Sequence, residues 1–255
     1  MSLKDKNFDN RASTFKNNIY GTGKGKIREA VLMRDLEELT VGRDKLRILD
    51  IGGGQGQIAL QLAKKGHEVT LTDISEEMLT IAKSKILEED IKQVTLIHSP
   101  LQELEDKLDY SYDLVLCHAV FEWLDDPFTA LKTLQHFCKP GGFISLMFYN
   151  QAGQTLSNLV YGNFDYIKAG MKAKKVVKLN PQSSIDSDDV YKWCDLLGLA
   201  VLKKIGVRCF HDYMRDISKW NSDFDNILEM ELKYSQIEPY ASIGRYTHLL
   251  IKNGS

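Results

Sequence analysis

The sequence has few cysteines, few prolines and no long apolar run. Its four cysteines lie far apart and form no C-x-x-C pair, which disfavours both a disulfide framework and a zinc site. No stretch approaches the roughly 20 consecutive apolar residues of a membrane-spanning helix, and the first residues lack the apolar centre of a signal peptide. These absences predict a cytoplasmic protein with no metal site and no membrane partner.

Neither sign of charge dominates the 255 residues, because the formal net charge at pH 7 is only −2. Hydrophobic residues make up 43% of the chain and charged residues 27%, which is typical of a globular protein. Basic side chains are concentrated in two segments: they outnumber acidic ones ten to five over residues 168–215 and eight to four over residues 1–35. A polyanion could bind there, although most charged runs are simply solvated surface.

Short apolar runs alternate with helical patterns from residue 46 onward. This order predicts right-handed βαβ units and an α/β fold, with a mostly parallel sheet and helices on both faces. Ligands of such sheets bind at the carboxyl ends of the strands. The expected strands are 46–50, 67–73, 94–98, 112–118 and 143–149; helices are expected from Ser75 and over 129–137, the latter stopped by Pro140-Gly141-Gly142.

The pattern loosens after residue 150. We expect one structural domain in four parts: an N-terminal cap or gate (1–35), a Rossmann-like core (36–150), a basic insertion near the substrate site (151–183) and a C-terminal part that completes the sheet (184–255). The last part is expected to hold a helix over 188–197, a strand over 199–210, a helix over 217–234 and a closing strand over 244–252.

The strongest local motif is Leu49-Asp50-Ile51-Gly52-Gly53-Gly54-Gln55-Gly56. Its glycines permit a sharp turn from strand to helix and a close approach of a ligand to the backbone. The spacing G-x-G-x-G differs from the dinucleotide fingerprint G-x-G-x-x-G. Asp73, at the end of the second strand, could bind the hydroxyls of a ribose or could cap the helix that starts at Ser75. A second glycine-rich run, 21–26, lacks the order of a phosphate loop and is expected to be a flexible gate.

Four motifs in sequence order carry a resemblance to a known family: 50–56, Asp73, 113–118 and 139–142 followed by a strand. Together they resemble class I S-adenosylmethionine-dependent methyltransferases. The resemblance implies a Rossmann-like sheet of about seven strands, parallel except for one strand near its edge. It also implies S-adenosylmethionine as cofactor and S-adenosylhomocysteine (SAH) as product.

Shorter segments resemble one subfamily along almost the whole chain, the tRNA 5-carboxymethoxyuridine methyltransferases. That family methylates the carboxylate of 5-carboxymethoxyuridine at the wobble position of tRNA, giving the methyl ester. The resemblance implies that the anticodon loop of tRNA is the partner. The matching segments are 7–9, 18–22, 24–25, 121–123, 146–150, 162–166, 206–208, 210–213 and 232–246.

The resemblance also implies the residues of the site. A carboxylate substrate is already ionised at neutral pH, so no catalytic acid or base is expected, and positioning carries the reaction. The cofactor contacts would be Arg28, Gly52, Gly53, Asp73, Leu101, Gln102 and His118.

Candidates to bind the substrate follow from chemistry, because arginine holds carboxylates and lysine meets phosphates. Tyr161, Phe164 and Tyr166 could stack against bases or form a small core of the insertion. The substrate-binding candidates are Tyr149, Asn150, Lys174, Lys175, Arg208, His211, Arg215 and Arg245.

Three other functions compete with this interpretation. The main alternative is a methyltransferase of a small-molecule carboxylic acid, for which the basic insertion would be irrelevant. The others are a non-catalytic nucleotide- or tRNA-binding module and a nicotinamide oxidoreductase. The intact glycine motif disfavours the former, and its spacing disfavours the latter.

Overall fold

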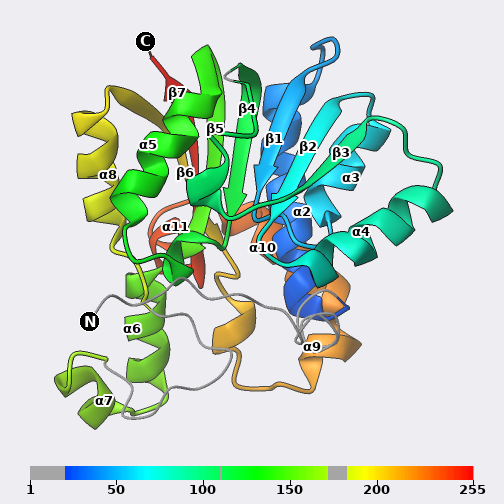
Figure 1. Cartoon of the computed structure of the whole chain (residues 1–255). Helices are drawn as coiled ribbons and strands as arrows, with labels where there is room; N and C mark the ends of the chain where they lie inside the picture. Colours follow the sequence, from blue (N-terminus) through cyan, green and yellow to red (C-terminus); the bar gives the residue numbers. More distant parts are fainter. Residues whose placement is uncertain (1–20, 110, 172–182, 255) are drawn as a thin grey trace.

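A single seven-stranded sheet forms the centre of the computed structural model, which describes residues 21–109, 111–171 and 183–254 (Figure 1). The strand order is β3-β2-β1-β4-β5-β7-β6, and β7 runs antiparallel to both of its neighbours. The expected sheet with one antiparallel strand near its edge is therefore confirmed. The strands are β1 (Arg47–Ile51), β2 (Glu68–Asp73), β3 (Val94–His98), β4 (Tyr112–His118), β5 (Cys138–Tyr149), β6 (Leu199–Val207) and β7 (Tyr246–Asn253).

Helices cover both faces of the sheet, as the βαβ pattern predicts (Figure 1). The α helices on one face are α2 (Gly23–Thr40), α3 (Gln57–Lys64), α4 (Glu76–Glu88) and α10 (Phe224–Tyr234), and those on the other are α5 (Pro127–Phe137) and α8 (Ser187–Leu196). The remaining helical segments are α6 (Gln151–Val160), α7 (Phe164–Lys168), α9 (Lys219–Ser222), α11 (Tyr240–Ile243), η2 (Leu101–Glu103), η3 (Phe121–Trp123) and η4 (His211–Tyr213).

Three expected bounds are wrong. Strand β5 starts at Cys138 and includes Pro140-Gly141-Gly142, because a register shift in its pairing with β4 accommodates these residues. Strand β6 ends at Val207, where Arg208 takes a left-handed backbone conformation with φ of 61°. The helix expected over 217–234 is interrupted at Asp223, whose backbone (φ −131°, ψ 28°) is not helical.

The glycine-rich run 21–26, all of which the structure describes, is not a flexible loop. Thr22 caps α2 by accepting a hydrogen bond from the Gly25 amide at 3.4 Å, and the helix begins at Gly23. Helix α2 continues beyond residue 35 to Thr40 and buries Ile27 and Leu36 in the core. The run that was expected to be a flexible gate is therefore the first turn of a packed helix.

The carboxyl ends of the parallel strands face α6, α7 and α9, which lie below the sheet in Figure 1, α6 and α7 at the left and α9 at the right. The described part of the insertion thus lies at the ligand edge. Tyr161 and Phe164 are 63% and 55% exposed, so they do not form a small core there.

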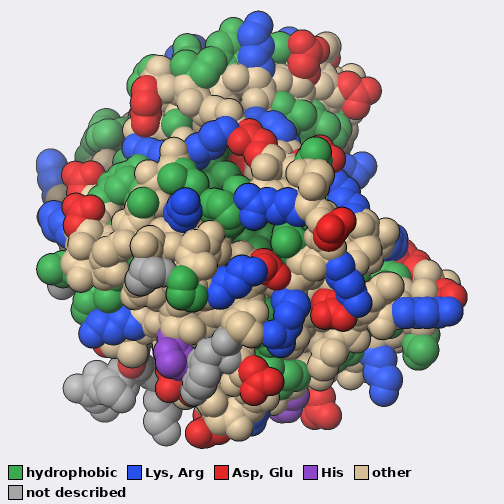
Figure 2. Space-filling view, turned by 90° about the horizontal axis from the view of Figure 1, so that it is seen from above, with side chains coloured by type: hydrophobic (Ala, Val, Ile, Leu, Met, Phe, Trp, Pro, Cys, Tyr) green, Lys and Arg blue, Asp and Glu red, His purple; other side chains and the backbone are tan. Residues whose placement is uncertain are grey.

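The opposite edge of the sheet carries charges of both signs. Figure 2 shows this face from above, with blue and red side chains interspersed. Ion pairs such as Lys45–Glu68 and Lys139–Asp113 account for part of that mixture. A polyanion would meet no continuous basic patch on this face. Within the described ranges, no helix is long and apolar enough to cross a membrane.

Candidate cofactor and substrate site

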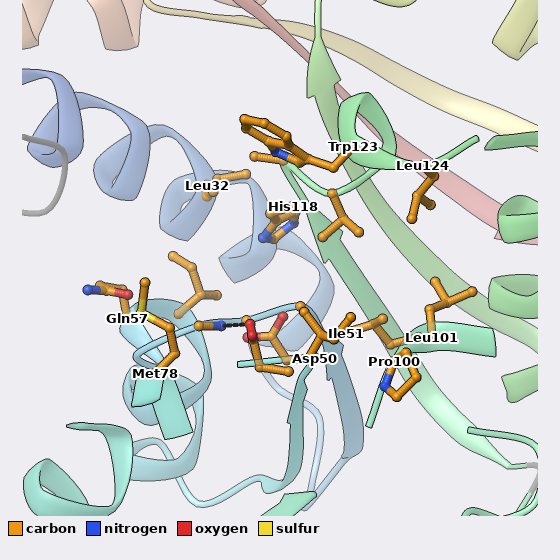
Figure 3. Close-up of a pocket in the computed structure, with 18 of the residues that line it drawn as sticks. Leu32, Asp50, Ile51, Gln57, Met78, Pro100, Leu101, His118, Trp123 and Leu124 are labelled. Atoms are coloured by element: carbon orange, nitrogen blue, oxygen red, sulfur yellow. Dashed lines mark hydrogen bonds between the residues drawn. The ribbon is translucent and has the colours of Figure 1, made fainter. Parts of the chain in front are cut away.

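A pocket opens where β1, β2 and β4 end, at the edge that the parallel topology predicts (Figure 3). Helix α2 forms one wall, and η2 and η3 form the opposite one. In Figure 3 His118 points into the pocket from β4, beneath Trp123 and between Leu32 and Leu124. The pocket is lined by all seven residues predicted to contact the cofactor: Arg28, Gly52, Gly53, Asp73, Leu101, Gln102 and His118.

The glycine motif forms the floor of this pocket because its turn excludes side chains. A Cβ added to Gly53 would lie 2.4 Å from Asp50 Oδ2 and from Leu71 Cδ1. Gly52 has φ of +66°, in the left-handed region that favours glycine. The amides of Gly52 and Gly53 donate to the Thr72 carbonyl at 2.8 and 3.2 Å. The turn is therefore fixed to the end of β2, and its backbone faces the pocket.

Asp73 holds the start of α4 through the cap residue Ser75 and also lines the pocket, so it is not itself the N-cap of that helix. Its Oδ1 accepts a hydrogen bond from the Ser75 amide at 2.8 Å, just before α4, and Ser75 itself caps that helix through the Met78 amide. Its Oδ2 accepts from the Gly54 amide at 2.8 Å, and its side chain also lines the pocket. Asp73 thus joins the glycine turn to the start of α4 at the point where a ribose could bind.

Asp50 places a second carboxyl group in the lining, close to Asp73. Burial, together with the negative charge of Asp73, raises the pKa of Asp50 from 3.8 to about 7. A neutral Asp50 limits the repulsion between the two groups. A cationic ligand in this pocket would favour the ionised form.

A cluster of arginines and tyrosines lies beyond the pocket, where β5 ends and β7 begins. Tyr149 and Tyr246 are paired in register, with their ring centroids 5.7 Å apart. The Arg245 guanidinium lies 4.9 Å from the Tyr149 ring centroid, and that of Arg208 lies 5.5 Å from the Tyr246 ring centroid. Asp212 pairs with Arg208 at 2.5 Å but is 3.9 Å from Arg245 Nε. Of the two arginines, Arg245 is therefore the one that Asp212 neutralises less.

The charge of Asp212 is held by its neighbours. Although burial opposes ionisation, the hydrogen bond from His211 and the charges of Arg208, Lys24 and Arg245 keep the pKa of Asp212 below its usual value. Asp212 therefore remains an anion beside the arginines at neutral pH. One carboxylate facing two guanidinium groups leaves a net positive charge in the cluster.

Two of the predicted substrate contacts, Asn150 and His211, have structural roles. Asn150 is 1% exposed, its Oδ1 caps α6 through the Ala152 amide, and its Nδ2 donates to the carbonyls of Ser242 and Gly244. His211 is also 1% exposed, and its ring stacks on Trp220 at 4.4 Å. Both side chains hold neighbouring segments in place, and both are almost fully buried in the ligand-free structure.

The other predicted substrate residues lie in different surroundings, and two of them fall outside the described part of the chain. Tyr149 is 6% exposed and contributes its ring to the cluster. Arg215 lies on the surface after η4. Lys174 and Lys175 lie outside the described residues.

Comparison with known proteins identifies the family. A methyltransferase-domain family model matches residues 49–144. The tRNA 5-carboxymethoxyuridine methyltransferase of Escherichia coli (strain K12) is 42% identical over 250 residues, which cover 97% of this chain and 96% of that protein. This chain belongs to the tRNA 5-carboxymethoxyuridine methyltransferase family. The subfamily resemblance inferred from short motifs is therefore confirmed.

Solved structures support the fold. Magnesium protoporphyrin IX methyltransferase from Synechocystis PCC 6803, with bound SAH, matches with a TM-score of 0.67 at 15% identity and covers 96% of both chains. An S-adenosylmethionine-dependent methyltransferase from Clostridium acetobutylicum ATCC 824 matches with a TM-score of 0.63 at 14% identity, over 97% of this chain and 99% of that one. The class I methyltransferase fold is confirmed.

The structure adds residues to which the sequence reasoning gave no role. Glu122 in η3 is 1% exposed, and burial raises its pKa to about 7, while the Tyr149 amide and the charge of Arg28 oppose that rise. Tyr246 is part of the tyrosine pair, and Trp123 lines the pocket. Glu122 and Trp123 lie in the segment 121–123 that contributes to the family resemblance. The signal was present, but nothing in it shows which way these side chains point.

The Asp50 carboxyl group predicts a pH-dependent stability. Since its pKa in the folded protein is above the unfolded value, its favourable contribution is complete below about pH 3.8 and is lost as the pH rises through about 7. Asp50→Asn removes this loss. We expect its free energy of unfolding, relative to the unmodified protein, to increase by roughly 2–4 kcal/mol between pH 4 and pH 7.

Urea unfolding of the ligand-free proteins across this pH range measures that difference. Asp106→Asn, at an exposed aspartate, is the control and should run parallel to the unmodified protein. A pH-independent difference for Asp50→Asn would contradict the predicted burial of an uncharged carboxyl group.

Proposed function

We propose that this chain transfers a methyl group from S-adenosylmethionine to the carboxylate of 5-carboxymethoxyuridine at the wobble position of tRNA, forming the methyl ester. The observation that carries the proposal is the adjacency of two sites, the glycine-floored pocket and the cluster around Arg245: the charges of Arg28, which lines the pocket, and of Arg245 both act on the Tyr246 ring. The family assignment supports the same reaction. The cap, core, insertion and C-terminal part are then proposed as parts of one catalytic domain.

The pocket fits S-adenosylmethionine by its chemistry. The side-chain-free turn at Gly52 and Gly53 admits a ligand close to the backbone, and Asp73 offers carboxylate oxygens for ribose hydroxyls. Leu101, Gln102 and Arg28 lie around the same space, and His118 closes its inner end. When bound, S-adenosylmethionine supplies a methyl group made electrophilic by its sulfonium; transfer forms a carboxylate oxygen–methyl bond, breaks the sulfur–methyl bond and leaves SAH.

The arginine cluster positions the nucleophile. Because the substrate carboxylate is already ionised at neutral pH, the protein need not remove a proton. Arg245 is proposed to hold it, since Arg208 is already paired with Asp212 at 2.5 Å. One guanidinium grips one side of the carboxylate and leaves an oxygen lone pair for the methyl group. Such alignment can lower the barrier by roughly 7–11 kcal/mol.

The partner is proposed to be the anticodon loop, approached from the edge where α6 and α7 lie. The exposed rings of Tyr161 and Phe164 offer stacking surfaces to unstacked bases. Lys174 and Lys175 are proposed to meet backbone phosphates. The opposite face carries basic and acidic side chains interspersed (Figure 2).

Reversing the charge of Lys174 and Lys175 to Glu tests this docking. Each lost phosphate contact should reduce the slope of log affinity against log salt by about 0.7–0.9, so tRNA binding should weaken and become less salt-dependent. The Kd of SAH should not change. The matched control reverses Lys83 and Lys92, which are exposed and lie outside the basic segments. Equal tRNA turnover at physiological salt in all three proteins would refute the docking proposal.

The function itself is tested with labelled S-adenosylmethionine and two tRNA pools, one carrying 5-carboxymethoxyuridine and one lacking it. We expect label only in the modified pool, and we expect mild alkali to release it because an ester hydrolyses. Absence of label from both pools, with intact SAH binding, would refute the tRNA substrate and favour a small-molecule carboxylic acid.

A further inference from the structure

A buried chain of polar side chains runs from α2 to the cofactor pocket. Asp35 Oδ2 lies 2.9 Å from His248 Nδ1, and His248 Nε2 lies 2.8 Å from Ser145 Oγ. Ser145 Oγ in turn lies 2.8 Å from Nε2 of His118, which lines the pocket. Asp35, Ser145 and His248 are each 0% exposed. An unpaired polar group in a dry core destabilises the folded protein, so each member of this path should have its donors and acceptors paired. The direction of each hydrogen bond can therefore be worked out from its neighbours.

The sheet register explains why these residues meet. His118, Ser145 and His248 belong to the adjacent strands β4, β5 and β7. Met147 pairs with both His118 and His248, and Ser145, two residues earlier on β5, shares its face. Helix α2 packs on that face and supplies Asp35.

The charge of Asp35 decides which atoms of the path carry the protons. Arg34 donates to its Oδ1 from Nε at 2.9 Å and from Nη2 at 2.6 Å, and Gln236 donates to the same oxygen at 3.1 Å. Although burial opposes ionisation, the hydrogen bond from His248, the charge that His248 carries when protonated and the charge of Arg34 keep the pKa of Asp35 below its usual value. An ionised Asp35 can only accept, so His248 must donate from Nδ1.

The rest of the chain follows from charge balance. Arg34 and His248 both contact Asp35, and Arg34 already balances its single negative charge, so a proton on both nitrogens of the fully buried His248 ring would leave this cluster with an unbalanced positive charge. A His248 ring with its proton on Nδ1 alone accepts at Nε2, where the Ser145 hydroxyl, 2.8 Å away, can donate to it. Ser145 Oγ then accepts from His118 Nε2–H. Nε2 is thus the ring nitrogen of His118 that the sheet holds, and the same side chain lines the pocket.

We propose that Asp35, His248 and Ser145 are positioning residues that hold His118 as its Nε2–H tautomer, so that Nδ1 accepts a hydrogen bond from a donor of the bound cofactor. The proposal rests on the proposed cofactor but not on tRNA as substrate. Burial, followed by the charge that His248 carries when protonated and by the charge of Arg28, lowers the pKa of His118 well below its usual value, which keeps the ring neutral and able to accept. Asp35 on α2 thereby determines, through the two sheet residues between them, that Nδ1 of His118 is a hydrogen-bond acceptor.

The test uses histidine labelled with ¹⁵N in the full ligand-free protein, with the His118 signal assigned by its loss in His118→Gln. We expect a single Nε2–H tautomer of His118 in the unmodified protein. Ser145→Ala should give a mixture of tautomers and raise the Kd of SAH, measured by calorimetry, about two- to tenfold. Ser145→Thr keeps the hydroxyl and should restore the single tautomer.

Met147→Leu is the packing control, because it alters the same face of β5 without a hydrogen-bonding group and conserves volume. It should change neither the tautomer nor the Kd. The proposal is overturned if His118 carries its proton on Nδ1, or if Ser145→Ala remains folded with the tautomer and the Kd unchanged. A protein that passes these tests but does not methylate tRNA would refute the proposed function alone.

Discussion

Replacing Arg245 by methionine is expected to lower kcat/KM for tRNA about 10- to 100-fold and to leave the Kd of SAH unchanged. A charge-assisted hydrogen bond contributes roughly 1.5–3 kcal/mol, and each 1.4 kcal/mol changes a rate about tenfold. Arg245 is the guanidinium that Asp212 neutralises less, because that carboxylate is 3.9 Å from Arg245 Nε but 2.5 Å from Arg208. Its loss should therefore remove substrate positioning while the cofactor pocket stays intact.

Single-turnover kinetics and calorimetry on the same preparation separate the two effects. Arg43→Met is the matched control, since it removes the same charge from an exposed arginine that lies over Phe143, near the opposite edge of the sheet. Turnover should stay within about twofold of the unmodified protein in that control. A normal kcat/KM in Arg245→Met would exclude Arg245 as the residue that holds the carboxylate. A large loss in Arg208→Met alone would transfer the role to Arg208.

The cofactor pocket was predictable because its residues follow the strands directly in sequence. A glycine run after an apolar strand and an acidic residue at the end of the next one are local signals. Parallel topology alone brings strand ends to one edge. The sequence alone therefore places Gly52, Asp73 and His118 at one edge of the sheet, where the pocket lies.

The substrate-binding residues were less predictable, because ion pairs and hydrogen bonds between distant segments decide which side chains are available. Sequence chemistry named Arg208 and Arg245 equally, and only the position of Asp212 distinguishes them. Asn150 has the right chemistry at the right strand end, but its side chain is used by the carbonyls of Ser242 and Gly244, more than 90 residues away. Neither hydrogen bond can be predicted from the residues that surround Asn150 in the sequence.

The buried path to His118 shows the same limit. Asp35 and His248 are separated by 213 positions along the chain, and a buried aspartate inside a helix resembles any other charged residue in the sequence. The strand bounds failed for a related reason: the register of β4 and β5 keeps Pro140-Gly141-Gly142 within a strand, although these residue types usually end one.

Asp73→Ala is expected to raise the Kd of S-adenosylmethionine about 10- to 150-fold, which corresponds to the roughly 1.5–3 kcal/mol of hydrogen bonds to a charged group. The carboxylate lines the pocket and also accepts from the amides of Gly54 and Ser75, each at 2.8 Å. Its removal should therefore cost both the ribose contact and the anchoring of the glycine turn. Calorimetry on protein shown to be folded by its thermal unfolding measures the loss.

Ser75→Ala separates binding from helix capping. Ser75 is 0% exposed and caps α4 through the Met78 amide, so its loss should lower the free energy of unfolding by about 1 kcal/mol. It should leave the cofactor Kd nearly unchanged, because Ser75 does not line the pocket. If Asp73→Ala and Ser75→Ala lost stability alike and both bound cofactor normally, Asp73 would be a capping residue only. Both variants disturb the start of the same helix. A large rise in the cofactor Kd for Asp73→Ala but not for Ser75→Ala would therefore show that the Asp73 carboxylate contacts the cofactor.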